Sequence, residues 1–325
     1  MANTLVIGGT SLIGRPLVQA LLDRGHTVTI MHRSPGTPFG DQVDEVHADR
    51  NDPAAVAGEI GKRRYDLVFD NVYDWERGTT ADQVLATVGA IAHDDLVRYV
   101  FVSSVAAYPE GGPFDEDADL RPASDPLEYG VHKAETERAL FHLAEEEGFP
   151  VATTRPAFVY GPHNPFPREA FFWDRLVAGR PIIVPGDGTR AMQWVHADDI
   201  ATASIRAATR DAGRGHAFNL AGDPVSQNEF VNTLARVAGV GADLVHVPRE
   251  KLLDAGGQLF SPPFYFGAYL DMEPIIAEND RVRDALDVEL TPLEEGLGGT
   301  FEWYRSQDRP APDTSWEDSV LATLD

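Results

Sequence analysis

A short apolar strand, a glycine-rich turn and a helix follow one another at the start of the chain. Thr4–Gly8 is the apolar run, and Arg15–Asp23 has the periodicity of an amphipathic helix that ends at Gly25. Glycines between the two allow a tight turn and let the backbone approach a pyrophosphate at the N-terminus of the helix. The motif is incomplete, because Ser11 stands where its middle glycine is usual. We expect this turn to bind a dinucleotide through Gly8, Thr10, Ser11, Leu12, Ile13 and Gly14.

The alternation of strands and helices continues through the first half of the chain. Helical patterns such as Thr79–His93 and Lys133–Glu147 separate apolar runs that are rich in Val, Ile and Phe. Such runs are typical of parallel strands whose sheet is covered by helices on both faces. The predicted fold class is therefore α/β, a Rossmann-type doubly wound parallel sheet with a smaller C-terminal lobe. The further expected strands of the sheet are Thr27–Met31, Val43–His47, Asp66–Asp70, Arg98–Ser103 and Val151–Arg155.

The sequence changes character after Tyr160, where turn-rich segments and short strands (Pro181–Val184, His216–Ala221) replace the regular alternation. We expect residues 1–160 to form the dinucleotide-binding domain, with return segments near 190–222. Residues 161–325 should form mostly the substrate-binding lobe. Pro and Gly are dense at 255–268, and the Pro- and Asp-rich tail from Gln307 is expected to be loosely held.

The charge balance excludes several classes of partner. The chain carries 27 basic and 52 acidic residues, a net charge of −25. Such a field repels phosphate backbones and anionic lipid heads, so we expect neither nucleic acid nor membrane as a partner, but a small-molecule substrate. The chain has no cysteine, no apolar stretch of membrane-spanning length and no apparent leader, which favours a cytoplasmic protein. Its ten histidines form no HExxH or HxH motif, so no metal site is expected.

The end of the second strand is the position that reads the cofactor ribose. An acidic residue there would bind a 2′-hydroxyl, whereas a basic residue accommodates a 2′-phosphate. This chain has His32 followed by Arg33 and Ser34, and Asp49 and Arg50 follow the third strand at the expected adenine end. We therefore expect NADP to be preferred, with NAD as the alternative.

A serine, a tyrosine and a lysine form the candidate catalytic group. Ser103 and Ser104 end the fifth strand, which places them at the carboxyl edge of the sheet, where ligands bind. Tyr129 and Lys133 are four residues apart and therefore share one helix face. A lysine ammonium beside a phenol stabilises the phenolate, so that Tyr129 could exchange a proton near neutral pH.

Together with the glycine turn, these residues resemble the extended short-chain dehydrogenase/reductase family, in particular its atypical epimerase-like members with a GGTxxxG turn. The resemblance extends over nearly the whole chain, through the segments RPAFVYGP (155–162), PGDG (185–188) and VHADD (195–199). It implies that Ser104 orients the substrate, that Tyr129 is the acid/base and that Lys133 holds the cofactor ribose. Ser103 and Pro156 would also lie at the cofactor, and hydride would pass between substrate carbon and nicotinamide.

The residues that face the substrate depart from the family pattern. Phe158 and Met192 stand where nucleotide-sugar enzymes usually have Asn and Arg, both of which touch the diphosphate. Arg190 could replace the missing arginine. Val105 and Ala106 follow Ser104 in place of the Asp-Glu pair of dehydratases, so 4,6-dehydration is not expected. The expected substrate contacts are Ser104, Ala106, Phe158, Arg190 and Met192.

Three functions remain open from the sequence. The first is an NAD(P)-dependent epimerase or oxidoreductase acting on a sugar-like hydroxyl or ketone, such as a nucleotide sugar. The second is an NADPH-dependent reductase of a non-nucleotide carbonyl compound. The third, a cofactor-sensing or RNA-binding relative without catalysis, is disfavoured by the intact Ser104, Tyr129 and Lys133 and by the net charge. Relatives often form homodimers through the two helices beside the middle strands, so a homodimer is also expected.

Overall fold

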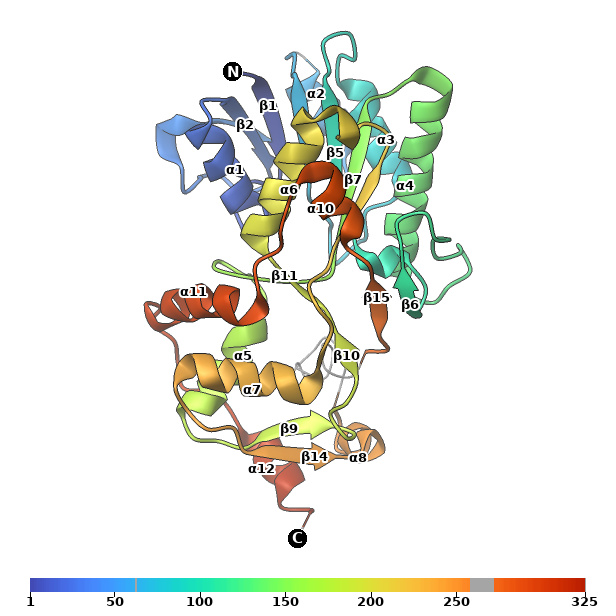
Figure 1. The fold of residues 1–325 in the computed structure, drawn as a ribbon. Helices are drawn as coiled ribbons and strands as arrows, with labels where there is room; N and C mark the ends of the chain where they lie inside the picture. The colour runs from blue at the N-terminus through green and yellow to red at the C-terminus, as the bar shows by residue number, and fades with distance from the viewer. Residues whose placement is uncertain (62, 258–271, 325) are drawn as a thin grey trace.

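A seven-stranded parallel sheet forms the upper part of the molecule (Figure 1). The computed structural model describes residues 1–61, 63–257 and 272–324. The strand order is β12-β7-β5-β4-β1-β2-β3, and each neighbouring pair is parallel. This is the predicted doubly wound sheet, and the expected strands agree with the observed ones to within a residue at most ends. The strands are β1 (Asn3–Ile7), β2 (Thr27–His32), β3 (Asp44–His47), β4 (Leu67–Asp70), β5 (Arg98–Val102), β7 (Val151–Pro156) and β12 (Ala217–Leu220).

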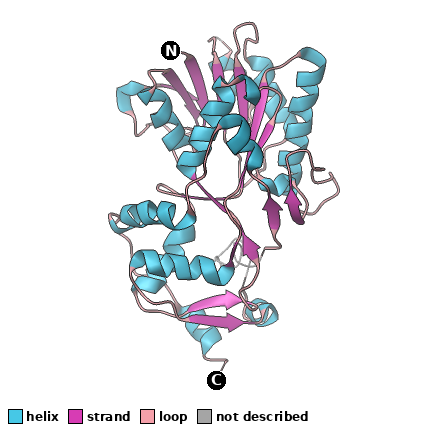
Figure 2. Ribbon diagram, in the orientation of Figure 1, coloured by secondary structure: helices cyan, strands magenta, loops and turns pink. Residues whose placement is uncertain are grey.

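Helices cover both faces of this sheet, as Figure 2 shows. One face is packed by α1 (Gly14–Asp23), α6 (Ala197–Thr209) and α10 (Asp280–Leu286), whose apolar side chains share a cluster with Val6 and Ile30. The other face is packed by α2 (Pro53–Ile60), α3 (Ala81–Ala90) and α4 (Glu128–Glu147), which meet Leu5 and Ile7. Alternate residues of β1 thus enter opposite hydrophobic layers, as a pleated strand requires.

Two of these helices differ from the sequence expectation. The helix α4 begins at Glu128, five residues before the predicted start at Lys133, and therefore contains Tyr129 within its first turn. The helix α2 was not predicted; Asp52 caps it by accepting hydrogen bonds from the backbone of Ala54 and Ala55, and Pro53 opens it. An N-cap acid followed by proline is a strong local start signal, so the information was present in the sequence.

The lower part of the molecule is a smaller lobe with an aromatic core. Tyr160, Phe172, Trp173, Trp194 and Phe230 are all buried there. Its helices are α5 (Arg168–Val177), α7 (Gln227–Ala238), α8 (Arg249–Asp254), α11 (Leu293–Arg305) and α12 (Ser315–Leu321). Its longer strand pair is β9 (Ile182–Pro185) with β14 (Leu244–Val247). The remaining short pairs are β6 (Gly111–Phe114) with β15 (Ile275–Ala277), β8 (Phe158–Tyr160) with β11 (Trp194–His196), and β10 (Ala191–Met192) with β13 (Val225–Ser226).

The chain passes between the two parts more than once. After β8 and α5 it returns to the sheet as α6 and β12, and later again as α10, which packs near α6. This arrangement supports a division into a dinucleotide-binding domain of residues 1–160 with return segments near 190–222, and a lobe formed mostly by 161–325. We propose that division, with 280–290 added to the return segments.

The C-terminal tail is held more firmly than its composition suggests. Glu317 and Val320 of α12 are buried, and Glu317 pairs with Arg175 of α5 at 2.5 Å. Earlier in the tail, Arg309 pairs with Asp174 at 2.6 Å. The expectation of a loose tail was wrong because single side chains, among them Arg309, Glu317 and Val320, anchor an otherwise polar segment. Most of the Pro- and Gly-dense stretch at 255–268 lies outside the described residues.

None of the helices described in residues 1–61, 63–257 and 272–324 combines the length and the apolar character needed to cross a bilayer.

Candidate active site

The candidate site lies where the strand order reverses. β1 and β4 are neighbours in the sheet, and the chain crosses from β3 at one edge back to β4 at that point. In open parallel sheets, ligands bind beyond the carboxyl ends of the strands at such a switch point. The glycine turn follows β1, Ser104 follows β5, and α4 brings Tyr129 and Lys133 to the same edge.

The glycine turn is as closely packed as a dinucleotide turn needs to be. Gly8 has φ +84°, and a Cβ at this position would collide with Val72. A Cβ at Gly14 would collide with the carbonyl oxygen of Gly8, which explains why the first turn of α1 can lie directly on the strand. A larger residue at either position would displace the turn from the place where we expect the pyrophosphate to bind.

The N-terminus of α1 fits an anionic group. Ile13 at the N-cap makes no side-chain cap, and the first turn contains no acidic residue. Free backbone N–H groups and the helix dipole favour a phosphate at such an end. One of the predicted donors is engaged, since the N–H of Leu12 donates to the carbonyl of His163 at 3.3 Å. A pyrophosphate would thus meet the turn beside the 161–167 loop.

Ser104 and Tyr129 are in direct contact. The Ser104 hydroxyl donates a hydrogen bond to the Tyr129 oxygen, which lowers the pKa of the phenol, but burial has the larger effect and raises that pKa overall. Ser104 also accepts a hydrogen bond from the backbone N–H of Ala106 at 3.1 Å, where it caps the short 3₁₀ turn Val105–Ala107. The capping bond fixes the serine beside the phenol.

Lys133 is buried, yet in the described residues no carboxylate lies within ion-pair distance of it. Its Nζ donates to the carbonyl of Val102 at 2.8 Å and lies 4.6 Å from the centre of the Phe101 ring. The side chain is 4% exposed, and burial lowers its pKa to about 8. A buried ammonium without an ion-pair partner is unusual, and its two remaining N–H groups fit hydroxyl acceptors such as those of a ribose.

A buried polar network holds α4 against the sheet. The carboxylate of Glu137 is fully buried. Its two oxygens share the single Nε–H of Arg155 on β7, and Oε2 also accepts from Nη2 of Arg155. Ser103 and Thr153 donate further bonds to it. Arg155 also donates to the hydroxyl of Tyr108. The Ser103 hydroxyl is therefore committed to Glu137, not to a cofactor. Sequence reasoning missed Glu137, although its spacing of four from Lys133 places both on one helix face.

Aromatic side chains from two loops cover Tyr129. The ring of Trp75, on the loop after β4, stacks on the Tyr129 ring at 4.8 Å, and Tyr73 meets it edge-on at 4.8 Å. Phe166 packs edge-on against Trp75 at 5.8 Å, and the hydroxyl of Tyr73 is 2.9 Å from Nδ1 of His132. Trp75 is 57% exposed, so its ring lies between Tyr129 and solvent.

At the end of β2, where we expect the cofactor ribose to bind, basic side chains are paired with acidic ones. Arg33 is 63% exposed, and its guanidinium lies 3.2 Å from the carboxylate of Asp74. Arg77 bridges Asp74 and Asp49 at 2.6 and 2.7 Å. The hydrogen bond from the backbone N–H of Asn51, and after it the bond from Arg77, lower the pKa of Asp49. A 2′-phosphate would therefore compete with Asp74 for Arg33.

Arg50 lies elsewhere than expected. Its side chain is 4% exposed and forms an ion pair with Asp70 of β4. It also donates hydrogen bonds to the hydroxyl of Thr87 and to the carbonyl oxygen of Gln83. The hydroxyl of Tyr99 donates to the same Asp70 at 2.6 Å. The guanidinium of Arg50 is thus unavailable to a cofactor, and a contact at this position would have to use its backbone.

The predicted substrate residues fall into two groups. Phe158 is half-buried, with its ring 5.3 Å from that of Trp194, whereas Met192 is 5% exposed within the aromatic core of the lobe. Met192 therefore packs behind the residues that line the predicted substrate pocket. Arg190 pairs with Glu273 at 3.1 Å and lines an open hollow of about 640 Å³ with Arg249 and His246. Ala106 is buried beside Ser104.

Known proteins resemble this chain in sequence and in fold. The chain is 30% identical over 268 residues to the chloroplast stem-loop binding protein of 41 kDa b from Arabidopsis thaliana, a match covering 76% of this chain and 66% of that protein. It is 27% identical to the UDP-glucose 4-epimerase of Mycolicibacterium smegmatis, over 94% of this chain and 100% of that one. Its fold matches the crystal structure of the Thermotoga maritima UDP-glucose 4-epimerase with UDP-glucose, at a TM-score of 0.75 and 22% identity, over 93% and 98% of the two chains.

Residues 4–221 match the model of the NAD dependent epimerase/dehydratase family. That span includes the glycine turn, Ser104, Tyr129, Lys133 and the return segment up to β12. The resemblance expected from the sequence is thereby confirmed, and the chain belongs to the NAD dependent epimerase/dehydratase family.

Proposed function

We propose that this protein is an NAD(P)-dependent epimerase or oxidoreductase that transfers hydride to and from a carbon bearing a sugar-like hydroxyl or ketone. The observation that carries the proposal is the group formed by Ser104, Tyr129 and Lys133 at the switch point of the sheet. The serine and the phenol are hydrogen-bonded, and the buried ammonium has two N–H groups to offer. A lysine that only stabilised the fold would be expected to pair with a carboxylate, because an unpaired buried charge is costly.

Each of the three side chains has a distinct task in the proposal. The Ser104 hydroxyl orients the substrate oxygen, and the Tyr129 oxygen takes or returns its proton. The Lys133 ammonium holds the cofactor ribose and, as a positive charge near the phenol, favours its ionised form. The nicotinamide, when bound, supplies the hydride acceptor or donor. Trp75 and Phe166 exclude water from the Tyr129 ring.

We further propose that NADP binds more tightly than NAD, by at least about tenfold. The exposed Arg33 can donate to a 2′-phosphate, and a charge-assisted hydrogen bond contributes about 1.5–3 kcal/mol. Dissociation constants for both cofactors, measured by tryptophan quenching at fixed salt, test this. Arg33→Ala should reduce the preference and His32→Ala should change it only slightly. Equal affinities for the two cofactors would show that Arg33 stays with Asp74.

The choice between epimerase and reductase depends on whether the cofactor leaves. An epimerase returns the hydride to the same substrate and can keep its nicotinamide, whereas a reductase exchanges it at each turnover. Mass and absorbance spectra of the cofactor released from purified protein decide between them. Retained oxidised cofactor supports the epimerase; an empty site that fills with added NADPH supports a reductase of a non-nucleotide carbonyl compound. Failure to bind either cofactor would contradict both.

The apolar character of the pocket favours a substrate without a nucleotide diphosphate. Phe158 and Met192 are apolar at the two positions where contacts to a diphosphate would need polar side chains, and Arg190 is already paired with Glu273. We expect UDP and GDP to bind more weakly than about millimolar in calorimetry, which corresponds to less than about 4 kcal/mol. Micromolar binding of either nucleotide would instead indicate a nucleotide sugar and assign Arg190 as its diphosphate contact.

Two further points concern partners. The stem-loop binding in the name of the Arabidopsis relative is not extended to this chain, because a net charge of −25 opposes contact with phosphate backbones. We also propose a homodimer through α3 and α4, the helices beside the middle strands. Sedimentation equilibrium tests it, and a monomer at micromolar concentration would contradict it.

A further inference from the structure

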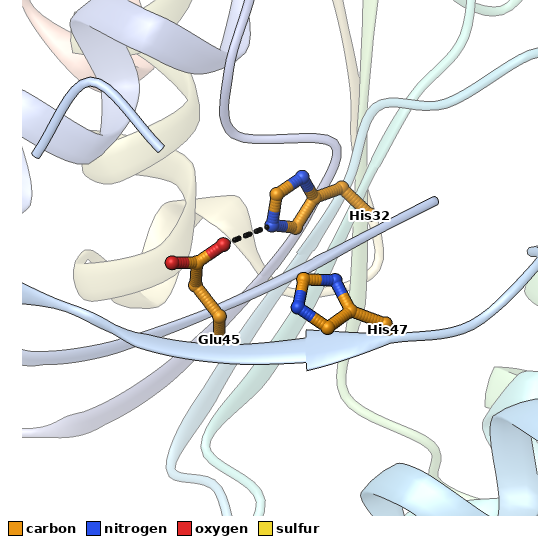
Figure 3. Close-up of side chains that lie close together, drawn as sticks. All are labelled: His32, Glu45 and His47. Carbon is orange, nitrogen blue, oxygen red and sulfur yellow. Dashed lines mark hydrogen bonds and ion pairs between the residues drawn. The ribbon is translucent and has the colours of Figure 1, made fainter. Parts of the chain in front are cut away.

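Three metal-ligating side chains lie together at the outer edge of the parallel sheet, on β2 and β3 (Figure 3). In the register of these strands His32 is opposite His47, and Glu45 lies two residues before His47. Side chains two apart on a strand point to the same face, so all three share one face of the sheet. The cluster forms because β2 and β3 pair in the sheet, so its residues are not close enough in the sequence to form a recognisable histidine motif.

The distances are close to those of a metal site. Nε2 of His32 is 2.8 Å from a carboxylate oxygen of Glu45, and the two imidazole rings have centres 5.0 Å apart. One ligand atom from each of the three side chains lies within 4.8 Å of the others. Ligand atoms around a tetrahedral zinc ion, bound at about 2.0–2.1 Å, are about 3.3 Å apart. Small side-chain rotations therefore suffice to surround an ion.

The burial of the three groups suits a site open on one side. The His32 side chain is 8% exposed, that of Glu45 is 26% exposed, and His47 is at the surface. Between the last two, Val46 is buried in the hydrophobic layer under α2, which fixes the backbone of β3. The buried ligand and the two strands are held in place, while the outer ligands can adjust and the remaining coordination positions face water.

The donor set and the charge select the kind of ion. Two imidazoles and one carboxylate are typical of zinc and neighbouring transition metals, whereas magnesium and calcium prefer oxygen ligands alone. A chain with a net charge of −25 also favours cations over anions at its surface. We propose that His32, Glu45 and His47 bind one divalent transition-metal ion of the zinc type. From the sequence we expected no metal site, because its histidines form no HExxH or HxH motif.

The test uses the full chain after treatment with a chelator. We expect calorimetry to show one equivalent of zinc bound at about micromolar affinity, cobalt to give the visible absorption of a coordinated ion, and magnesium to leave both signals unchanged. Zinc should also raise the melting temperature, since it binds the folded form. The test does not depend on turnover, so it is independent of the proposed function.

Variants assign the ligands. His47→Ala removes a surface side chain and should fold normally, with its zinc affinity reduced at least tenfold; Glu45→Gln should behave alike. The matched control is His216→Ala, which removes an exposed histidine distant from β2 and β3 in sequence and should leave binding unchanged. Absence of zinc binding to the wild type, or equal affinity in His47→Ala and His216→Ala, would overturn the proposal and leave a simple hydrogen bond between His32 and Glu45.

Discussion

The parallel sheet and the C-terminal lobe stabilise their buried charges in different ways. In the sheet, Glu137 is fully buried and accepts bonds from Arg155, Ser103 and Thr153, so its carboxylate is saturated. In the lobe, Glu169 is also buried, but its Oε1 has no hydrogen-bond partner, and the carboxylate accepts a long bond of 3.4 Å from the Asn164 amide and lies near the charge of Arg168. The carboxylate of Glu137 is thus held by a network of hydrogen bonds, whereas that of Glu169 in the lobe is not.

This difference matches the tasks proposed for the two regions. A hydride-transfer site requires a fixed geometry, and the network around Glu137 holds the helix that contains Tyr129 and Lys133. A lobe that shapes a substrate pocket can tolerate adjustment, and its core is made of large rings that contact one another through faces and edges. The following predictions test the comparison, from the largest expected effect to the smallest.

The largest effect is expected in the sheet region, at Tyr129. Tyr129→Phe removes only the hydroxyl, so folding and cofactor binding should survive while turnover of a confirmed substrate falls by about 10²–10⁴-fold. Lys133→Met should weaken cofactor binding as well. The measurement is steady-state turnover together with cofactor titration. Near-normal turnover in Tyr129→Phe would remove the catalytic assignment from this region.

A matched pair of substitutions compares stability in the two regions. Glu137→Gln leaves the buried Arg155 without its counter-charge and should cost about 3–5 kcal/mol of unfolding free energy. Glu317→Gln, which breaks the pair with Arg175 in the tail, should cost about 1–3 kcal/mol, because it releases one short helix. Urea unfolding of both variants measures this. A larger cost for Glu317→Gln would reverse the ranking of the two regions.

Glu169 gives the stability of the lobe a dependence on pH. Burial raises the pKa of Glu169 from 4.5 to about 7. The folded chain therefore binds more protons than the unfolded chain between these values, and stability falls as pH rises from 4.5 through 7, by up to about 3 kcal/mol. Glu169→Gln stays neutral and should be more stable than the wild type at pH 8, with the two converging near pH 4.5.

The control for that experiment is Glu145→Gln, which neutralises an exposed carboxylate of α4. Its stability should follow the wild type at each pH between 4.5 and 8 in urea unfolding. If Glu169→Gln also follows the wild type, then the carboxyl of Glu169 finds a partner in solution and the contrast between the regions weakens.

The smallest effect is expected at the aromatic cover of Tyr129. Trp75→Ala removes a ring that stacks on the phenol, an interaction of about 0.5–1.5 kcal/mol, and should lower kcat/KM by about twofold to tenfold. Trp75→Phe keeps a ring and should retain most of the activity. A loss as large as that of Tyr129→Phe would make Trp75 a direct substrate contact and not a cover.

The local patterns determined the sheet almost completely. Strands such as Thr27–Met31 and Arg98–Ser103 are short apolar runs between turn signals, and the structure extends or shortens them by one residue. The glycine turn and the i, i+4 spacing of Tyr129 and Lys133 were readable for the same reason, because each depends on neighbours along the chain. They were enough to predict the family.

Contacts between segments that are distant in the sequence could be identified only in the tertiary structure. Arg50 follows a strand end as expected, yet its side chain turns to Asp70, twenty residues later in the chain. Trp75 reaches Tyr129 because β4 and β5 are neighbours in the sheet. The tail is held in part by its ion pairs with Arg175 and Asp174 of α5. No periodicity along the sequence encodes such meetings.

The sequence by itself determined that this chain folds as a doubly wound sheet with a dinucleotide turn and a Ser-Tyr-Lys group, since those features arise from local propensity and spacing. Only the tertiary structure decided which charges are paired. Arg33 lies beside Asp74, and His32 beside Glu45, because loops and strands far apart in sequence meet at one edge. A side chain is paired or left available by three-dimensional proximity, and proximity across a parallel sheet is set by topology.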